Sequence, residues 1–158
     1  MPSRHWTAKL SGRCCGFTLV ELLVAVTVIA TLVAIAIPVY STYVELSKVA
    51  KATGDIAILE NRIEKHLLNN GTLPGGLAEL EEPTPPDSWG RPYQYANYDL
   101  VPPGKRRKDH FLVPLNSDYD LYSKGKDGNS SPPITASGSR DDIIRANNGN
   151  YVGLASNY

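Results

Sequence analysis

Cysteine is scarce in this sequence, which limits how the fold can be held. The two cysteines are adjacent, Cys14 and Cys15, and neighbouring cysteines are poor partners for an ordinary disulfide. No metal-ligand spacing such as C-x-x-C occurs. An inert pair in a discarded leader is favoured over lipidation or metal binding. If that leader is removed, no cysteine remains, so packing or a metal must hold the fold even outside the cytoplasm.

Histidine and net charge are also scarce. The chain has three histidines and a formal net charge of zero, so no nucleic-acid partner is expected. His66 and His110 lie in no nucleophile or metal motif, which makes an enzyme the least supported class. The charge is unevenly placed, because the first 16 residues hold Arg4, Lys9 and Arg13 and no acidic residue.

A long apolar run follows this basic segment. From Leu22 to Val44 no residue carries a formal charge, and about 20 apolar residues suffice to cross a bilayer as a helix. A secretory signal peptide would have a run of about 7–15 residues and then a small-residue cleavage site, whereas here the run continues into a polar helix. The sequence predicts a single-pass anchor whose basic leader stays cytoplasmic.

Two residues of this segment are unusual for an anchor. A charged residue such as Glu21 within a spanning helix costs about 2.5–3.5 kcal/mol and suggests a function. Pro38 removes a backbone donor and is expected to kink or loosen the helix. The plainer alternative is a solvated, interfacial Glu21 and a Pro38 that is tolerated as prolines in membrane helices often are.

The leader and the start of the run resemble the signature of type IV prepilins, through Gly16-Phe17-Thr18-Leu19-Val20-Glu21-Leu22. The resemblance implies cleavage by the prepilin peptidase between Gly16 and Phe17, with N-methylation of Phe17. Glu21 and Pro38 then stand where such pilins carry these residues. It also implies an assembly role, since Glu21 would pair with the amine of Phe17 on a neighbouring subunit in a head-to-tail helical filament.

Beyond the anchor the helix is expected to continue to Asn70, where Asn69-Asn70-Gly71 predicts its end. Apolar residues recur at three- and four-residue spacing: Leu46, Val49, Ala50, Thr53, Ile56, Ala57, Ile63 and Leu67. The predicted organisation has four parts: a cleaved leader (1–16), a transmembrane and polymerisation segment (17–44), a soluble half-helix (45–70) and a periplasmic head (71–158).

The head is predicted to contain a helical turn over 77–80 and two strands, Tyr93–Leu100 and Phe111–Tyr122. A basic tetrad, Lys105–Lys108, connects the strands. A solvated hairpin tip is favoured for this tetrad over a contact with anionic polymer or lipid.

Three further motifs resemble the major pseudopilins of the type II secretion system. They are Asp87-Ser88-Trp89-Gly90-Arg91-Pro92-Tyr93-Gln94-Tyr95, the stretch Asp120–Gly128, and Asp141-Asp142-Ile143. The resemblance implies an α+β pilin-like fold, with the long helix packed on a small antiparallel sheet and a C-terminal loop region.

The same resemblance implies a calcium ion in the loop before Ile143. The expected ligands are Asp127, Asp141 and Asp142, with Ser137 and Ser139 as weaker candidates, and a loop rich in such oxygens suits calcium. The alternative is a polar turn with solvated acids. The loop departs from the family in carrying Pro132 and Pro133.

The expected function is that of a structural subunit. Before assembly it would reside in the bacterial inner membrane with its C-terminal domain in the periplasm. It would then polymerise with other copies of itself into a pseudopilus that drives export of folded exoproteins. The implied partners are the prepilin peptidase, minor pseudopilins, and an inner-membrane assembly platform with its ATPase. A type IV pilin for adhesion, motility or DNA uptake is the nearest alternative, and a membrane-tethered binding module that never polymerises is the second.

Overall fold

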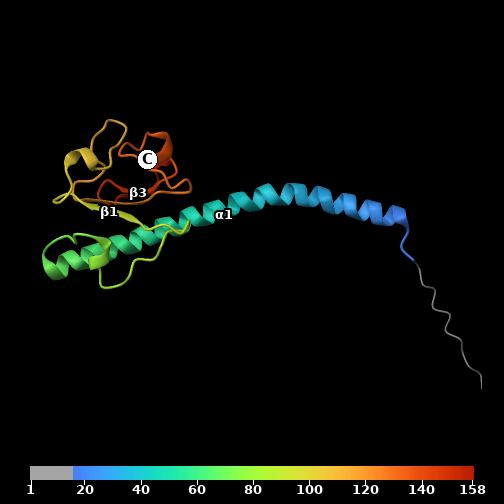
Figure 1. Cartoon of the computed structure of the whole chain (residues 1–158), viewed down its shortest axis with the longest axis horizontal. Coiled ribbons are helices and arrows are strands. Elements are labelled where there is room, and N and C mark those ends of the chain that lie inside the picture. The colour runs from blue at the N-terminus through green and yellow to red at the C-terminus, as the bar shows by residue number, and fades with distance from the viewer. Residues whose placement is uncertain (1–15) are drawn as a thin grey trace, which may run out of the picture. The chain divides into compact units, whose positions relative to one another are not determined.

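A computed structural model describes residues 16–158. It begins with a long helix, α1 (Leu19–Asn70), and continues with four strands joined by loops and short 3₁₀ turns (Figure 1). The chain divides into two compact units, of which the first ends at Ser41 and the second comprises Thr42–Tyr158. Most of the regular packing lies in the second unit, which contains the sheet and the last part of α1.

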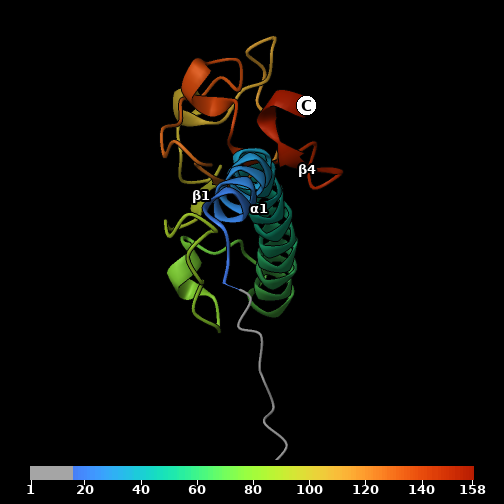
Figure 2. The ribbon, with the colours of Figure 1, turned by 90° about the vertical axis from the view of Figure 1, so that its right-hand side faces the viewer.

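The sheet is antiparallel throughout. Its strands are β1 (Gln94–Asn97), β2 (Tyr119–Ser123), β3 (Ile143–Ala146) and β4 (Tyr151–Leu154), in the spatial order β1-β2-β3-β4. Figure 2 shows β1 and β4 at opposite edges. The short 3₁₀ turns are η1 (Leu77–Glu79), η2 (Pro103–Lys105), η3 (Ser137–Ser139) and η4 (Ala155–Asn157).

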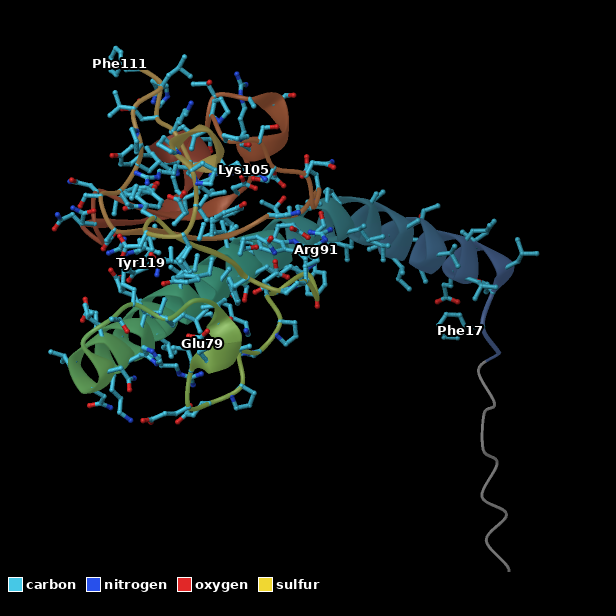
Figure 3. The ribbon with its side chains drawn as sticks, turned by 60° about the vertical axis from the view of Figure 1, so that its left-hand side comes forward. Phe17, Glu79, Arg91, Lys105, Phe111 and Tyr119 are labelled. Atoms are coloured by element: carbon cyan, nitrogen blue, oxygen red, sulfur yellow. The ribbon has the colours of Figure 1, made fainter. Side chains whose placement is uncertain are left out.

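One face of the sheet packs on α1. Four fully buried residues, spaced four, three and four apart, form one stripe of the helix: Ala52, Ile56, Leu59 and Ile63. Residues from β2, β3 and the loops meet this stripe: Leu80, Tyr93, Tyr119, Leu121 and Ile143. Tyr119 is labelled in Figure 3, where it lies between the sheet and the helix. This cluster is the main core of the second unit.

The opposite face of the sheet has its own small core. Ile144 lies in it although its neighbour Ile143 lies in the helix-side core, because successive strand residues point to opposite faces. Leu115, Ile134, Ala146 and Ala155 pack around Ile144. The sheet is therefore covered on both faces, by α1 on one and by loop segments on the other.

The predicted α+β fold is confirmed, and so is the predicted end of the helix. α1 ends at Asn70, and Gly71 has a φ of 76°, the left-handed conformation that glycine adopts at little cost. The Gly71 N–H donates to the Leu67 carbonyl at 2.8 Å. The predicted helical turn is also present, as η1.

The predicted strand Phe111–Tyr122 is wrong over its first part, since β2 begins only at Tyr119. Asp109 closes a turn instead, because its Oδ1 accepts the N–H groups of Phe111 (2.7 Å) and Val113 (2.9 Å). Leu112 sits in that turn with a φ of 61°. Strands β3 and β4 were not predicted, and β1 is shorter than the predicted Tyr93–Leu100.

The buried stripe of α1 provides a stability test. Ile56→Ala should lower the free energy of unfolding by about 2–5 kcal/mol, because it removes a buried side chain and opens a cavity in the core. Ile56 is 0% exposed, whereas Ile58, on the same helix, is 52% exposed. Denaturant unfolding of the purified chain in detergent measures both variants. Ile58→Ala is the matched control and should cost less than about 1 kcal/mol; equal losses would contradict the packing described.

Candidate functional site

The start of α1 is held by a reciprocal cap. The Thr18 hydroxyl accepts from the Glu21 N–H at 3.2 Å, and Glu21 Oε2 accepts from the Thr18 N–H at 3.0 Å and from its hydroxyl at 2.9 Å. This is the capping box that the T-x-x-E spacing favours. Phe17, labelled in Figure 3, precedes the cap and is exposed. Within its own chain Glu21 is thus bonded to Thr18, and its predicted pairing with a neighbour's amine stays a prediction.

The apolar part of α1 is exposed along its whole circumference. Every residue from 16 to 43 is exposed, although most of them are Val, Ile, Leu, Ala and aromatic residues. In the part of the chain that the structure describes, α1 is the one helix long and apolar enough to cross a membrane. α1 continues through Pro38. This surface needs lipid or other chains around it, since water would be a poor solvent for it.

Hydroxyl groups in this part of α1 are satisfied locally. Thr27 donates to the Val24 carbonyl and Thr31 to the Val28 carbonyl, each at 2.8 Å. Ser41 donates to the Pro38 carbonyl at 2.8 Å. These polar groups therefore meet the requirement of an apolar medium, where each must find a partner within the protein.

The Asp87–Tyr95 motif forms a tight turn around a buried carboxylate. Asp87 Oδ1 accepts the N–H groups of Trp89 (3.0 Å) and Arg91 (2.8 Å), and Asp87 Oδ2 accepts the Ser123 hydroxyl at 2.5 Å. Gly90 adopts a φ of 83° in this turn. The turn is tied to the sheet through Ser123, the last residue of β2.

Side chains of the same turn reach two other segments. The Ser88 hydroxyl donates to the Lys48 carbonyl of α1 at 2.9 Å, and Trp89 Nε1 donates to Glu45 at 3.3 Å. On the other side, Arg91 donates to the carbonyls of Gly125 and Lys126, the second at 3.0 Å. The motif thus joins the helix to the loop between β2 and β3.

The predicted calcium loop lies between β2 and β3. Asp141 Oδ2 accepts the Asp127 N–H at 2.8 Å, and Asp127 Oδ1 accepts the Asn129 N–H at 2.7 Å. Gly125 has a φ of 59°, and a Cβ there would lie 2.0 Å from the Asp141 carbonyl oxygen. Asp127 and Asp141 are therefore brought together by close backbone contact.

The other candidate ligands are arranged differently. The Ser139 hydroxyl exchanges hydrogen bonds with the backbone of Ser131, accepting at 2.8 Å and donating at 2.9 Å, and Ser137 begins η3. Asp142 is buried and bonds to Arg107 and Ser130, at 2.7 Å each. Within residues 16–158 no three His, Cys, Asp or Glu side chains gather closely enough to hold a metal ion. Calcium binding stays a prediction.

Burial raises the pKa of Asp142 to about 6, against the opposing effect of the Arg107 guanidinium and the Ser130 hydroxyl. At neutral pH this carboxyl is therefore mostly ionised and requires a cation nearby. The described structure supplies that cation from Arg107.

Comparisons with known proteins agree with the prepilin motif and extend beyond it. Residues 11–37 match the prokaryotic N-terminal methylation motif. The chain is 31% identical over 149 residues to the type II secretion system core protein G of Escherichia coli, covering 81% of this chain and 88% of that one. It is 30% identical to the core protein G of Pseudomonas aeruginosa, covering 72% and 84%. The chain belongs to the type II secretion system core protein G family.

Core protein G relatives cover most of the chain, whereas a fimbrial relative covers about a third of it. A fimbrial protein of Pseudomonas aeruginosa is 40% identical over 53 residues, which is 34% of each chain. No solved structure matches the chain. The family is a structural one, so the sites of interest in this member are those of processing, assembly and head stability and not of catalysis.

Sequence reasoning missed three buried charged residues in this core protein G chain. Arg107 was placed in a solvated tip but is 3% exposed. Asp120 accepts from the Arg107 N–H at 2.6 Å and the Tyr98 hydroxyl at 2.6 Å.

Arg145 binds Asp118 through two nitrogens, at 2.8 and 2.9 Å, and Glu60 of α1 at 2.7 Å. Arg145 falls within a stretch that matched no expected motif, so no sequence signal marked it.

Tyr98 makes the head sensitive to alkaline pH. Burial and the hydrogen bond to Asp120 raise the pKa of Tyr98 well above its usual value near 10. The folded state thus keeps a proton that the unfolded state loses above about pH 10, so stability present below that pH falls as pH rises. Each such tyrosine contributes about 1.4 kcal/mol of loss by pH 11.

Denaturant unfolding of the full chain in detergent at pH 9 and pH 11 measures this effect. Tyr98→Phe should be less stable at pH 9 but should lose about 1.4 kcal/mol less than the parent chain between the two pH values. An identical loss in both chains would show that Tyr98 ionises normally in the folded state.

Proposed function

We propose that this chain is a structural subunit of the periplasmic pseudopilus of the type II secretion system. The prepilin peptidase cleaves it between Gly16 and Phe17, and the amine of Phe17 is then methylated. Before assembly the subunit spans the inner membrane once, with its basic leader in the cytoplasm and its head in the periplasm.

The observation that carries this proposal is the exposed apolar surface of residues 17–43. A helix that is apolar all round is stable only when it is surrounded by lipid or by other apolar helices. Family membership gives the context in which such a surface changes from the first environment to the second. Identical helices then bury one another in a head-to-tail helical array.

Glu21 gives this array its register. A carboxylate among apolar helices is costly unless it is paired, and its bonds to Thr18 are the only ones it makes among the described residues. The methylated amine of Phe17 on the next subunit supplies the missing positive charge. A subunit inserted at another axial position would leave the Glu21 carboxylate unpaired.

The partners follow from the same assembly. The subunit polymerises with itself, meets minor pseudopilins in the filament, and is added by an inner-membrane assembly platform driven by a cytoplasmic ATPase. The growing filament helps to push folded exoproteins through an outer-membrane channel. A type IV pilin is the alternative, and the similarity to the fimbrial protein of Pseudomonas aeruginosa extends over 53 residues.

A deletion strain tests the proposed function. Its culture supernatant should lack secreted hydrolases, which should accumulate in the periplasm, and a plasmid copy of the gene should restore export. Protein assays of supernatant and periplasm measure both. Normal export together with loss of surface fibres, motility or DNA uptake would instead make the chain a type IV pilin.

Glu21→Ala should leave membrane insertion intact and reduce filament assembly at least tenfold, because the intersubunit pair is lost. Cross-linking of subunits and electron microscopy of sheared filaments measure assembly, and membrane fractionation measures insertion.

Thr18→Val is the matched control, because it removes the hydroxyl that bonds Glu21 and keeps the carboxylate. It should assemble normally apart from the cost of a weaker cap, about 1 kcal/mol. Equal defects in both variants would mean that Glu21 acts only by capping α1.

A further inference from the structure

A buried cation, the Arg107 guanidinium, contacts the loop between β2 and β3. Arg107, from the loop between β1 and β2, is 3% exposed, and Asp142 is 0% exposed. Arg107 Nη2 donates to Asp142 Oδ2 at 2.7 Å, and Arg107 Nη1 donates to the Ser131 carbonyl at 3.0 Å and to the Ser130 hydroxyl. Its guanidinium also lies 4.4 Å from the centre of the Tyr122 ring.

The guanidinium therefore links two separate parts of this loop through Asp142, which is also one of the expected metal ligands. Ser130 and Ser131 lie within the loop, and Asp142 is its last residue before β3. Ser130 also donates to Asp142 Oδ2 at 2.7 Å, so the loop closes around one ion pair. The backbone of Arg107 is also held in place, because its N–H donates to the buried Asp120 carboxylate at 2.6 Å.

The remaining candidate ligands have other partners. Asp127 and Asp141 accept backbone N–H groups at 2.7 and 2.8 Å, and Ser139 is bonded to the Ser131 backbone. Calcium takes six to eight oxygens, whereas the described residues bring no three acidic or histidine side chains together. The residues present do not fit the metal that the family resemblance implies.

Electrostatics leads to the same result. A calcium ion on Asp142 would carry its double charge to within a few ångströms of the guanidinium, in a buried site where charges are poorly screened. The free Asp142 Oδ1 and Arg107 Nε, which have no partner among the described residues, do not alter this, since the two groups already neutralise each other. A calcium ion bound to Asp142 Oδ1 would therefore be repelled by the guanidinium that is bonded to Oδ2.

We propose that in this chain the Arg107 guanidinium takes the structural place of a loop-bound calcium ion, so that the head folds and stays folded without the metal. The cation at this site is a side chain and so is covalently part of the protein. Its occupancy does not depend on the calcium concentration around the protein, and a chelator cannot remove it.

Thermal unfolding of the full mature chain in detergent tests this proposal, with near-ultraviolet circular dichroism reporting on the head. The parent chain should melt at the same temperature in excess calcium chloride and in excess EGTA, and calorimetric titration with calcium should give no binding heat at the loop. A fall in melting temperature on chelation, absent in Asp127→Ala, would overturn the proposal and establish the calcium site.

Variants of Arg107 test the cation itself. Arg107→Met should lower the melting temperature by more than about 10 °C, because it leaves the buried Asp142 carboxylate unpaired. Arg140→Met, at an exposed arginine of the loop between β2 and β3, is the matched control and should change the melting temperature little. If Arg107→Met fails to fold, Arg107→Lys/Asp142→Glu keeps both charges.

The double variant Arg107→Met/Asp142→Asn separates charge from packing. Since it removes both members of the pair, it should be more stable than Arg107→Met alone. Parental stability in Arg107→Met, with or without calcium, would show that the guanidinium does not support the loop.

Discussion

The contact between the sheet and one stripe of α1 is the interaction on which the head depends. Strands of four or five residues form a sheet too small to be stable alone, and such sheets need a packed partner. Ala52, Ile56, Leu59 and Ile63 provide that partner. The Asp87 turn and the Arg145–Glu60 ion pair then fix the sheet on the helix by polar contacts at its margins.

The second face of the sheet places a similar demand on the loops. Leu115, Ile134 and Ala155 cover Ile144 and Ala146, and these covering residues come from segments with little regular structure. Such segments keep one conformation only if their polar groups are satisfied. Buried Asp120 and the Arg107–Asp142 pair do this, so the charged groups beneath the loops are part of what keeps the outer core closed.

The secondary structure is predicted best from the sequence where one physical signal dominates. The apolar run, the prepilin motif and the Asn-Asn-Gly stop determine α1 locally, and the helix ends where predicted. The strand predicted from Phe111 fails because the apolar run that begins there lies in a turn that Asp109 closes. Phe111 is 86% exposed, at the outer end of that loop (Figure 3).

Long-range pairs explain the remaining misses. Arg107 stands among Lys105, Arg106 and Lys108, so its composition indicates a solvated tip. Its buried position depends on Asp142, 35 residues away, and on a loop path that no local pattern encodes. Asp142 was likewise identified by its motif, but the cation that it contacts comes from a different loop.

The local hydrogen bonds of Thr27, Thr31 and Ser41 have a consequence for how a subunit leaves the bilayer. Since each hydroxyl is bonded to a carbonyl of its own helix, none has to exchange partners when lipid is replaced by neighbouring helices. The transfer exchanges one apolar environment for another and adds no hydrogen-bond barrier from these groups.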